Sequence, residues 1–399
     1  MIAVVVAASA IPAHGTVTPS IEAYFAERSY VQGGSGVLEI SATARTLTVQ
    51  LFRAGGGTGP GLSGLPMSSP VTVAWNGTYD RLRFRPTSVT MQFWPSGLYF
   101  ARVTTNSGAA TLAPFVLRAR QPDPTRVAVV LPTNSWQAYN LRDDDGDGIP
   151  DSWYADPAIG SVALARPFVD GGTPPHYRDY DRGFIRWLAL TGRQPDFFSD
   201  DDLESFSSGR ALARRYDLIV FSGHEEYVTP HAYALIRDYR NAGGNLIFLS
   251  ANNFFYRVER RNGRIYRLGR YRDLGLPEAA LIGAQYVDWN HGVYPNRPYV
   301  VSGAGAAPWL FRGTGLRNGS RFGRYGIEID ARAPESPPGT RVVATIPDIF
   351  GAGKSAEMTY YRLGRAKVFD AGVINFGGTV DRGAPRRLMA NLWRALSNP

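Results

Sequence analysis

The chain has 399 residues, of which 44% are hydrophobic, so it can bury a large core and form two domains. The formal charge of +9 comes almost entirely from arginine, because Lys354 and Lys367 are the only lysines. The cations are scattered and no basic helix or RNA-binding aromatic signature accompanies them, which argues against a nucleic-acid partner. Because the sequence has no cysteine, disulfides, thiolate metal sites and cysteine nucleophiles are excluded.

The first residues, MIAVVVAASAIPAHG, hold an apolar stretch followed by small residues. This pattern resembles a secretory leader that lacks its basic start, so we expect residues 1–16 to be a partial signal peptide of a secreted bacterial protein. A first β-strand is the alternative interpretation. No run in the sequence reaches the ~18 apolar residues that a membrane helix needs, so we expect no membrane partner.

Residues 17–119 consist of short runs in which polar and apolar residues alternate, such as GVLEISAT, TLTVQLFRAG and VTMQFW. Gly, Pro, Ser and Asn separate these runs. Alternation with a period of two, without a helical stretch, predicts an immunoglobulin-like β-sandwich. The following sequence RARQPDPTR contains two prolines and has no periodicity, which predicts a linker over residues 120–126.

After the linker, the apolar runs VAVVLP, YDLIVFSG and GNLIFLSANN alternate with the helical patterns RGFIRWLALTG and TPHAYALIRDYRNAGG. Such an order predicts an α/β domain over residues 127–399 with a mostly parallel sheet, in addition to the all-β domain. Thr229 is a candidate helix cap, and Pro230 suits a first helical turn. Sites in these sheets lie at the carboxyl ends of the strands, where the sequence has SGHEEY and SANN.

The sequence DDDGDGIPD has the spacing of a calcium-binding loop. We expect Ca²⁺ at residues 143–151, in a structural role, with five ligands that occupy positions 1, 3, 5, 7 and 9 of an EF-hand-type loop: Asp143, Asp145, Asp147, the Ile149 carbonyl and Asp151. Position 12, which normally holds a bidentate Glu, is Tyr154, so we expect weak affinity. A solvated acidic turn without a metal is the alternative.

Four short motifs resemble the C-terminal domain of the N,N-dimethylformamidase beta (large) subunit family: SWQAYN, YRDYDRGFIRWL, SGHEEY and SANNFFYRV. The resemblance covers about residues 122–260 well and extends more loosely to about Asn375, and the preceding sandwich is similar too. It implies a class I glutamine amidotransferase-like, flavodoxin-like fold. It also implies a mononuclear Fe(III) held by Tyr139, Tyr180 and Glu226, with His224, Asn252 and Glu357 as catalytic residues. Tyr177 is the rival of Tyr180.

The function that this resemblance implies is iron-dependent hydrolysis of C–N bonds in small linear amides, in which a metal-bound hydroxide attacks the carbonyl. Three anionic oxygen ligands are well suited to Fe(III). The alternative is a secreted binding or scaffold protein with a structural calcium loop, in which Glu226 caps a helix and the tyrosines are ordinary core residues. A serine hydrolase is a weaker alternative, because no G-x-S-x-G motif occurs. The sequence leaves the substrate, the oligomeric state and a small partner subunit open.

Overall fold

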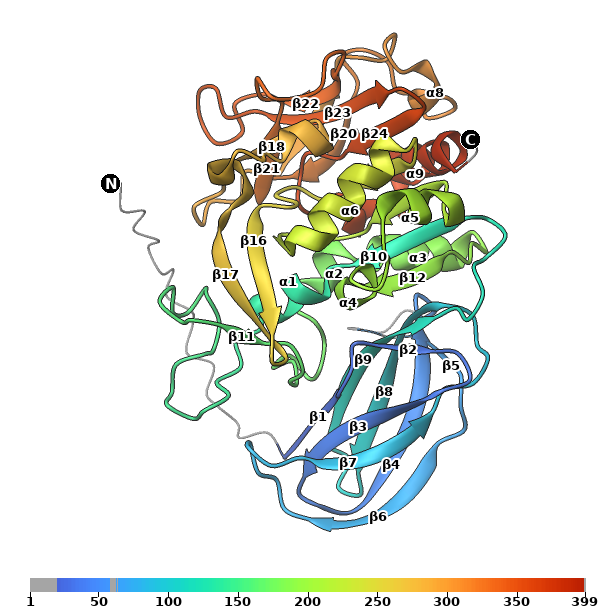
Figure 1. Ribbon diagram of the computed structural model, residues 1–399, viewed down its shortest axis with the longest axis vertical. Coiled ribbons are helices and arrows are strands. Elements are labelled where there is room, and N and C mark those ends of the chain that lie inside the picture. Colours follow the sequence, from blue (N-terminus) through green and yellow to red (C-terminus); the bar gives the residue numbers. More distant parts are fainter. Residues whose placement is uncertain (1–19, 58–61, 63, 398–399) are drawn as a thin grey trace.

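The computed structural model describes residues 20–57, 62 and 64–397 (Figure 1). The expected leader, residues 1–16, lies outside the described residues. The chain begins with strands that lie at one end of the molecule and continues into a larger part in which helices and strands alternate.

The described residues between 20 and 118 form two β-sheets that face each other. One sheet has the strand order β1-β3-β7, with β1 Ile21–Phe25, β3 Ser35–Ala42 and β7 Arg85–Thr90. The other has the order β2-β9-β8-β4-β5, with β6 paired to β4; its strands are β2 Ser29–Val31, β4 Ala44–Ala54, β5 Gly64–Pro66, β6 Val71–Gly77, β8 Gly97–Thr105 and β9 Ala110–Arg118. Leu38 and Ile40 from the first sheet pack with Leu51, Val103 and Phe115 from the second. Alternating side chains thus form a core between the two sheets.

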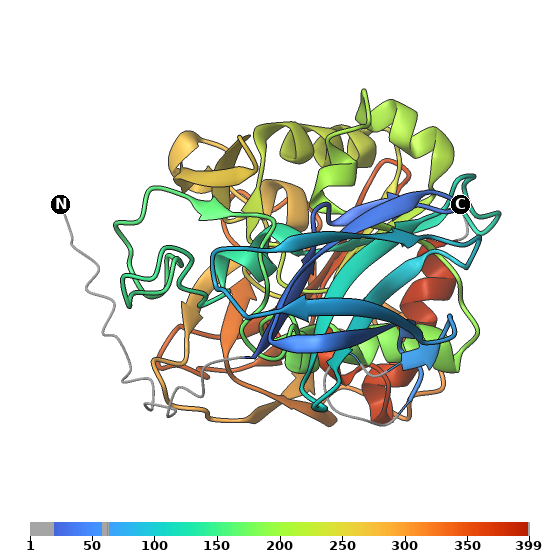
Figure 2. The same ribbon diagram turned by 90° about the horizontal axis from the view of Figure 1, so that it is seen from below.

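Residues 119–126 connect these sheets to the rest of the chain without a helix or strand. Arg126 is the last residue of this segment, and its guanidinium donates two hydrogen bonds of 2.8 Å to the Asp217 carboxylate. Phe100 of β8 shares a buried cluster with Leu188 of the helix α3 (Arg182–Leu190), so the two parts pack against each other. In the view from below, the blue strands of the first part cross in front of the rest of the molecule (Figure 2).

A nine-stranded sheet forms the centre of the second part. Five adjacent strands run parallel, in the order β12 (Asp196–Ser199), β10 (Val127–Leu131), β13 (Leu218–Phe221), β15 (Asn245–Phe248) and β24 (Ala366–Asp370). Every residue of β10, β13 and β15 is buried, because helices cover both faces of this half. The helices α3 and α9 (Gly383–Leu396) pack on one face, and α5 (Gly209–Arg215) and α6 (Pro230–Asn241) on the other.

The ends of α6 follow from its sequence. The Thr229 side chain accepts a hydrogen bond from the backbone N–H of Ala232 at 3.1 Å and so caps the helix. Pro230 occupies the first turn, where no N–H is needed. After the last turn, Gly243 takes a left-handed conformation with φ of +101°, which ends the helix.

The expectation of a flavodoxin-like, class I glutamine amidotransferase-like domain with a mostly parallel sheet is wrong. Of the eight strand pairs in the nine-stranded sheet, four are parallel and four are antiparallel. The antiparallel half consists of β23 (Ala356–Leu363), β22 (Arg341–Ile346), β19 (Arg297–Val301) and β20 (Arg321–Tyr325). Only two residues, Gly364 and Arg365, join β23 to β24, and so short a turn joins only antiparallel neighbours.

Smaller elements surround the carboxyl ends of the parallel strands. A four-stranded sheet has the order β11-β17-β16-β14, with β11 Val162–Ala163, β14 Tyr227–Val228, β16 Tyr256–Arg261 and β17 Arg264–Arg270. A pair is formed by β18 Gln285–Trp289 and β21 Glu328–Ala331. The short helices are α1 Thr133–Ala138, α2 Tyr177–Tyr180, α4 Asp200–Leu203, α7 Ala279–Ile282, α8 Pro308–Phe311, η1 Tyr271–Leu274 and η2 Gly377–Thr379. Among the described residues, no helix is both long and apolar enough to span a membrane.

Candidate metal centre

Three parallel strands deliver polar side chains to one edge of the central sheet. The helix α1 begins just after β10 and places Tyr139 at its C-terminal end. The segment after β13 carries His224 and Glu226, and the segment after β15 carries Asn252, which has a left-handed backbone with φ of +56°. Because parallel strands end at the same edge, residues from three separate motifs meet there.

The motif YRDYDRGFIRWL, which contains Tyr180, reaches this edge of the sheet because its backbone packs closely against another segment. Tyr180 ends the helix α2, which lies against η2. A Cβ atom on Gly378 would lie 1.9 Å from the carbonyl oxygen of Asp179, and a Cβ atom on Gly183 would lie 2.3 Å from the Gly378 backbone. Both glycines are therefore required for the contact that fixes Tyr180.

Glu226 lies at the centre of the group and is 2% exposed. Its Oε1 accepts a hydrogen bond from Asn252 Nδ2 at 3.2 Å, and its Oε2 accepts one from the Tyr154 hydroxyl at 3.2 Å. His224 Nε2 lies 3.4 Å from the same Oε2. The Ser135 hydroxyl of α1 accepts a hydrogen bond from the Glu226 backbone N–H at 3.0 Å, which ties the two segments together. The carboxylate is thus held from several elements.

Tyr139 and Tyr180 line one small cavity together with His224. The cavity has a volume of ≈10 Å³, which is room for about one water molecule. The Tyr139 hydroxyl is buried and finds no hydrogen-bond partner among the residues that the structure describes. Burial raises the pKa of both phenols well above the ordinary value, and the Glu328 carboxylate adds to this shift. Without a cation, both phenols therefore remain protonated.

His224 is buried, and neither ring nitrogen has a hydrogen bond of good geometry in the described part of the chain. Burial opposes its protonation, but the Glu226 and Glu328 carboxylates outweigh this effect and raise the pKa of His224. Asn252 Nδ2 donates to Glu328 Oε2 at 3.0 Å as well as to Glu226. Burial raises the pKa of Glu328 to about 7, and the neighbouring Glu226 carboxylate contributes to the increase. Glu328 therefore exchanges its proton near neutral pH.

The structure brings Glu328, and not Glu357, to this group. Glu357 lies on β23, where its Oε2 accepts hydrogen bonds from the backbone N–H and the Nε of Arg332 at 2.9 and 3.1 Å. The expectation that Glu357 belongs to this group therefore does not fit its position, and Glu328 occupies the place next to Asn252. The rival tyrosine Tyr177 packs in the main core cluster with Phe184, whereas Tyr180 faces the cavity.

Glu225 points away from Glu226. Its backbone N–H donates to Asn253 Oδ1 at 3.0 Å, and its carboxyl group is buried. Burial and the nearby Asp200 carboxylate raise the pKa of Glu225 well above the ordinary value. Adjacent glutamates thus have separate environments, as expected from the alternation of side chains in extended backbone.

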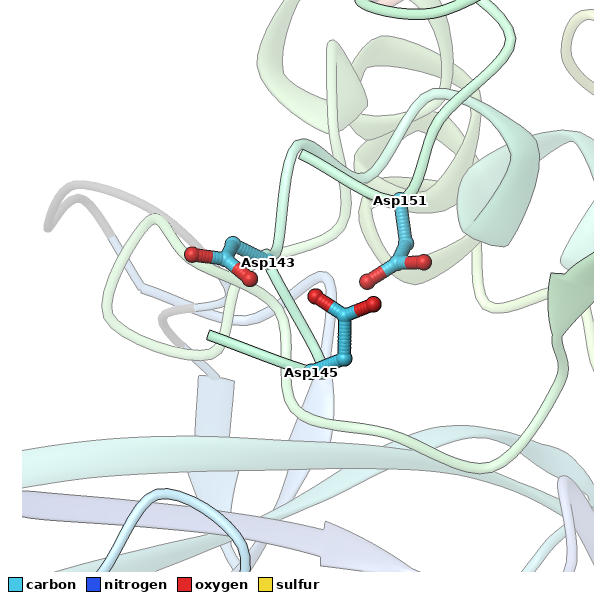
Figure 3. Close-up of side chains that lie close together, drawn as sticks. All are labelled: Asp143, Asp145 and Asp151. Carbon is cyan, nitrogen blue, oxygen red and sulfur yellow. The ribbon is translucent and has the colours of Figure 1, made fainter. Parts of the chain in front are cut away.

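The acidic loop of residues 143–151 comes just before Tyr154, whose hydroxyl contacts Glu226. One carboxylate oxygen each from Asp143, Asp145 and Asp151 lies within 4.8 Å of the others (Figure 3). Gly148 has a φ of +90°, which allows the sharp turn that position 6 requires. The Asp147 side chain instead accepts the backbone N–H of Ile149 at 2.7 Å. The loop thus gathers three of the four predicted aspartate ligands.

The family model described as "N,N-dimethylformamidase beta subunit-like, C-terminal" matches residues 74–387. The chain belongs to this family. The match covers most of the chain, including β8 and β9 of the sandwich and all residues of the candidate centre. Membership in the dimethylformamidase-like family indicates a hydrolase of the amidohydrolase type.

Other comparisons add no functional information to the family membership. A search of curated proteins finds no match. Among solved structures, the N-terminal domain of mmIFT52 aligns at 11% identity over 53% of this chain and 88% of its own, with a TM-score of 0.32. Escherichia coli alpha-2-macroglobulin activated by porcine elastase aligns at 12% identity over 26% of this chain and 9% of its own, with a TM-score of 0.19. Superoxide reductase from Ignicoccus hospitalis aligns at 10% identity over 25% and 80%, with a TM-score of 0.17. Scores this low carry no argument about fold or function.

Sequence reasoning missed two members of the group, Glu328 and Tyr154. Glu328 lies on β21, a short strand outside the central sheet, in the sequence GIEID. The alternation of polar and apolar residues in that sequence indicates a strand but not its neighbours. The sequence pattern marks Tyr154 only as position 12 of the calcium loop, although its hydroxyl contacts Glu226.

Proposed function

We propose that this member of the dimethylformamidase-like family is an iron-dependent amidohydrolase that cleaves C–N bonds of small linear amides. The observation that carries the proposal is that Tyr139 and Tyr180 line one cavity with His224, whose Nε2 lies 3.4 Å from Glu226 Oε2. The Tyr139 hydroxyl is buried there and lacks a partner among the described residues. Tyr139, Tyr180 and Glu226 would hold Fe(III).

The donor set fits a ferric ion on chemical grounds. Burial and the nearby carboxylates keep the two phenols neutral, which leaves buried oxygen atoms that only a strong cation can stabilise as anions. Two phenolates and one carboxylate supply three negative charges through hard oxygen atoms, the ligand type that Fe(III) prefers. When bound, the ion would polarise an amide carbonyl and lower the pKa of a water molecule.

The remaining residues are placed to move protons and orient the substrate. Glu328 has a pKa of about 7, so it can accept a proton from water and release it again near neutral pH. The Glu226 and Glu328 carboxylates raise the pKa of His224 against the effect of burial, and a protonated His224 ring can donate to a departing amine nitrogen. The Asn252 Nδ2 holds both carboxylates, while its Oδ1 has no partner within the described residues and can accept the N–H of a substrate or water.

The description of the matching family, rather than the volume of the cavity between Tyr139, Tyr180 and His224, supports a small amide substrate. We therefore propose short formamides and acetamides. The assay incubates the iron-loaded protein with formamide, N-methylformamide, N,N-dimethylformamide and acetamide and measures the released amine. Glu328→Gln should lower kcat by about 10²- to 10⁴-fold, the usual loss for a group that transfers a proton. Equal rates in wild type and Glu328→Gln, or no turnover of any amide by protein with a full iron content, would reject the proposal.

We also propose that Ca²⁺ binds the loop of residues 143–151 through Asp143, Asp145, Asp147, the Ile149 carbonyl and Asp151 and stabilises it. The clustered oxygens of Asp143, Asp145 and Asp151 support this assignment (Figure 3). The exposed position of the loop suits weak binding in calcium-rich extracellular fluid, in keeping with the proposed secretion of the protein.

A further inference from the structure

Tyr154 contacts two of the three residues that would bind the metal. Its ring stacks on that of Tyr139, with 4.0 Å between the ring centroids and 28° between the planes. Its hydroxyl donates to Glu226 Oε2 at 3.2 Å. Tyr154 is 45% exposed, whereas Glu226 is 2% exposed, so the hydrogen bond links a residue at the surface to a buried carboxylate.

The neighbours of Tyr154 fix its position. The Ser152 side chain is fully buried and donates to the Ala138 carbonyl at 2.7 Å, directly beside Tyr139. Trp153 is 4% exposed, stacks on Tyr227 at 5.1 Å and donates through Nε1 to the Ile159 carbonyl at 2.9 Å. Because Ser152 and Trp153 are both held by their contacts, the side chain of Tyr154, which follows them, is held in one place.

We propose that Tyr154 is a positioning residue of the metal centre: it orients the Tyr139 ring by stacking and one oxygen of Glu226 by its hydrogen bond. The effect on iron rests on the proposed function, whereas the effect on Glu226 does not. Asn252 holds Oε1 and Tyr154 holds Oε2, so the carboxylate has a donor on each side and cannot rotate without breaking both hydrogen bonds. Partners of this kind orient ligands and tune the electron density that they donate.

The test compares the full chain with the variants Tyr154→Phe and Tyr154→Ala. Tyr233→Phe is the matched control, because Tyr233 lies on α6, in a separate core cluster, and stacks on Tyr271. Each protein is titrated with Fe(III), and the visible charge-transfer band and the retention of iron against a chelator are measured. Tyr154→Phe keeps the stacking and removes the hydrogen bond, so its band should keep its intensity and move to shorter wavelength, since the released carboxylate donates more charge to iron.

Tyr154→Ala removes both contacts and should weaken iron binding by about 10- to 100-fold, the usual effect of losing an outer-shell partner. Tyr233→Phe should match wild type in band and affinity. An unchanged band in Tyr154→Phe together with unchanged affinity in Tyr154→Ala would overturn the proposal. A loss of most of the band in Tyr154→Phe at saturating iron would overturn it too, because Tyr154 would then be a ligand.

If wild type takes up no iron, the proposed function fails and the positioning role is tested separately. A crystal structure of metal-free Tyr154→Phe should then show the Glu226 carboxylate rotated away from its wild-type orientation. An identical orientation would overturn the inference.

Discussion

Replacing Glu226 with Gln should abolish iron binding, while the same change at Glu225 should leave iron binding intact. The two side chains are adjacent in sequence and almost equally buried, but they face different surroundings. The Glu226 carboxylate meets Asn252 and Tyr154, whereas the Glu225 carboxyl lies beside Asp200. Because Gln matches Glu in shape, the pair separates the effect of charge from the effect of volume.

The expected magnitudes differ strongly. Glu226→Gln lowers the number of anionic donors from three to two, so the loss of affinity should exceed the ~10- to 100-fold that removal of an outer-shell partner causes. Without metal, the amide introduced by Glu226→Gln would still accept one hydrogen bond, so the unfolding free energy should fall by no more than about 1–3 kcal/mol. At Glu225, burial and Asp200 already disfavour the charged form. An amide there can donate to Asp200, so Glu225→Gln should be as stable as wild type or more stable at pH 8.

Iron content by elemental analysis, the visible absorption band and urea denaturation at pH 8 measure these effects. The expected result is a colourless, folded Glu226→Gln and a coloured Glu225→Gln. If Glu225→Gln loses the metal and Glu226→Gln keeps it, the assignment of the two side chains is wrong. If both variants keep iron with an unchanged band, neither glutamate is a ligand and the donor set is wrong.

Three further predictions follow from the same geometry. Calcium removal with EGTA should lower the Tm, because the proposed Ca²⁺ would bind only the folded loop, and Asp145→Ala should remove that response; an equal EGTA effect in both proteins would contradict the site. The pKa of Glu328 in the folded metal-free protein, about 7, lies above its unfolded value, so the folded state binds more protons between the two values and the unfolding free energy should fall as pH rises from 5 to 8. Urea denaturation should show a smaller fall in Glu328→Gln, and an identical pH dependence would contradict the assignment. Limited proteolysis should first cut residues 119–126, which contain no helix or strand, and earlier cleavage within residues 216–260 would contradict this domain boundary.

Much of the parallel half of the sheet could be predicted from the sequence. The strands β10, β13 and β15 are continuous apolar runs because both of their faces are covered. The antiparallel half could not be predicted in the same way. The strand β19 has only two buried residues, Tyr299 and Val301, and β20 has only Phe322 and Tyr325, so neither gives a continuous apolar signal. The antiparallel direction of β23 is set by the turn Gly364-Arg365 that joins it to β24, and the effect of this turn appears only once the pairing is known.

Some residues of the candidate site could be predicted from the sequence, and others could not. His224, Glu226 and Asn252 follow directly after buried strands, so their common location follows from local patterns and the rule for parallel sheets. Glu328 comes 76 residues after Asn252 in the chain and reaches it through a hydrogen bond from Asn252 Nδ2. No local pattern encodes such a long-range contact, and the alternative Glu357 stands in an equally plausible strand sequence. Only the packing of the folded chain places Glu328, and not Glu357, next to Asn252.

The ferric centre formed by Tyr139, Tyr180 and Glu226 is the central claim, and resonance Raman spectroscopy of the iron-loaded wild type tests it most directly. Excitation into the visible charge-transfer band should enhance tyrosinate vibrations, and Tyr139→Phe and Tyr180→Phe should each reduce them, because the phenolate oxygens are direct donors. A wild-type protein that contains stoichiometric iron but gives no tyrosinate vibrations, or one whose spectrum is unchanged in both variants, would contradict the claim.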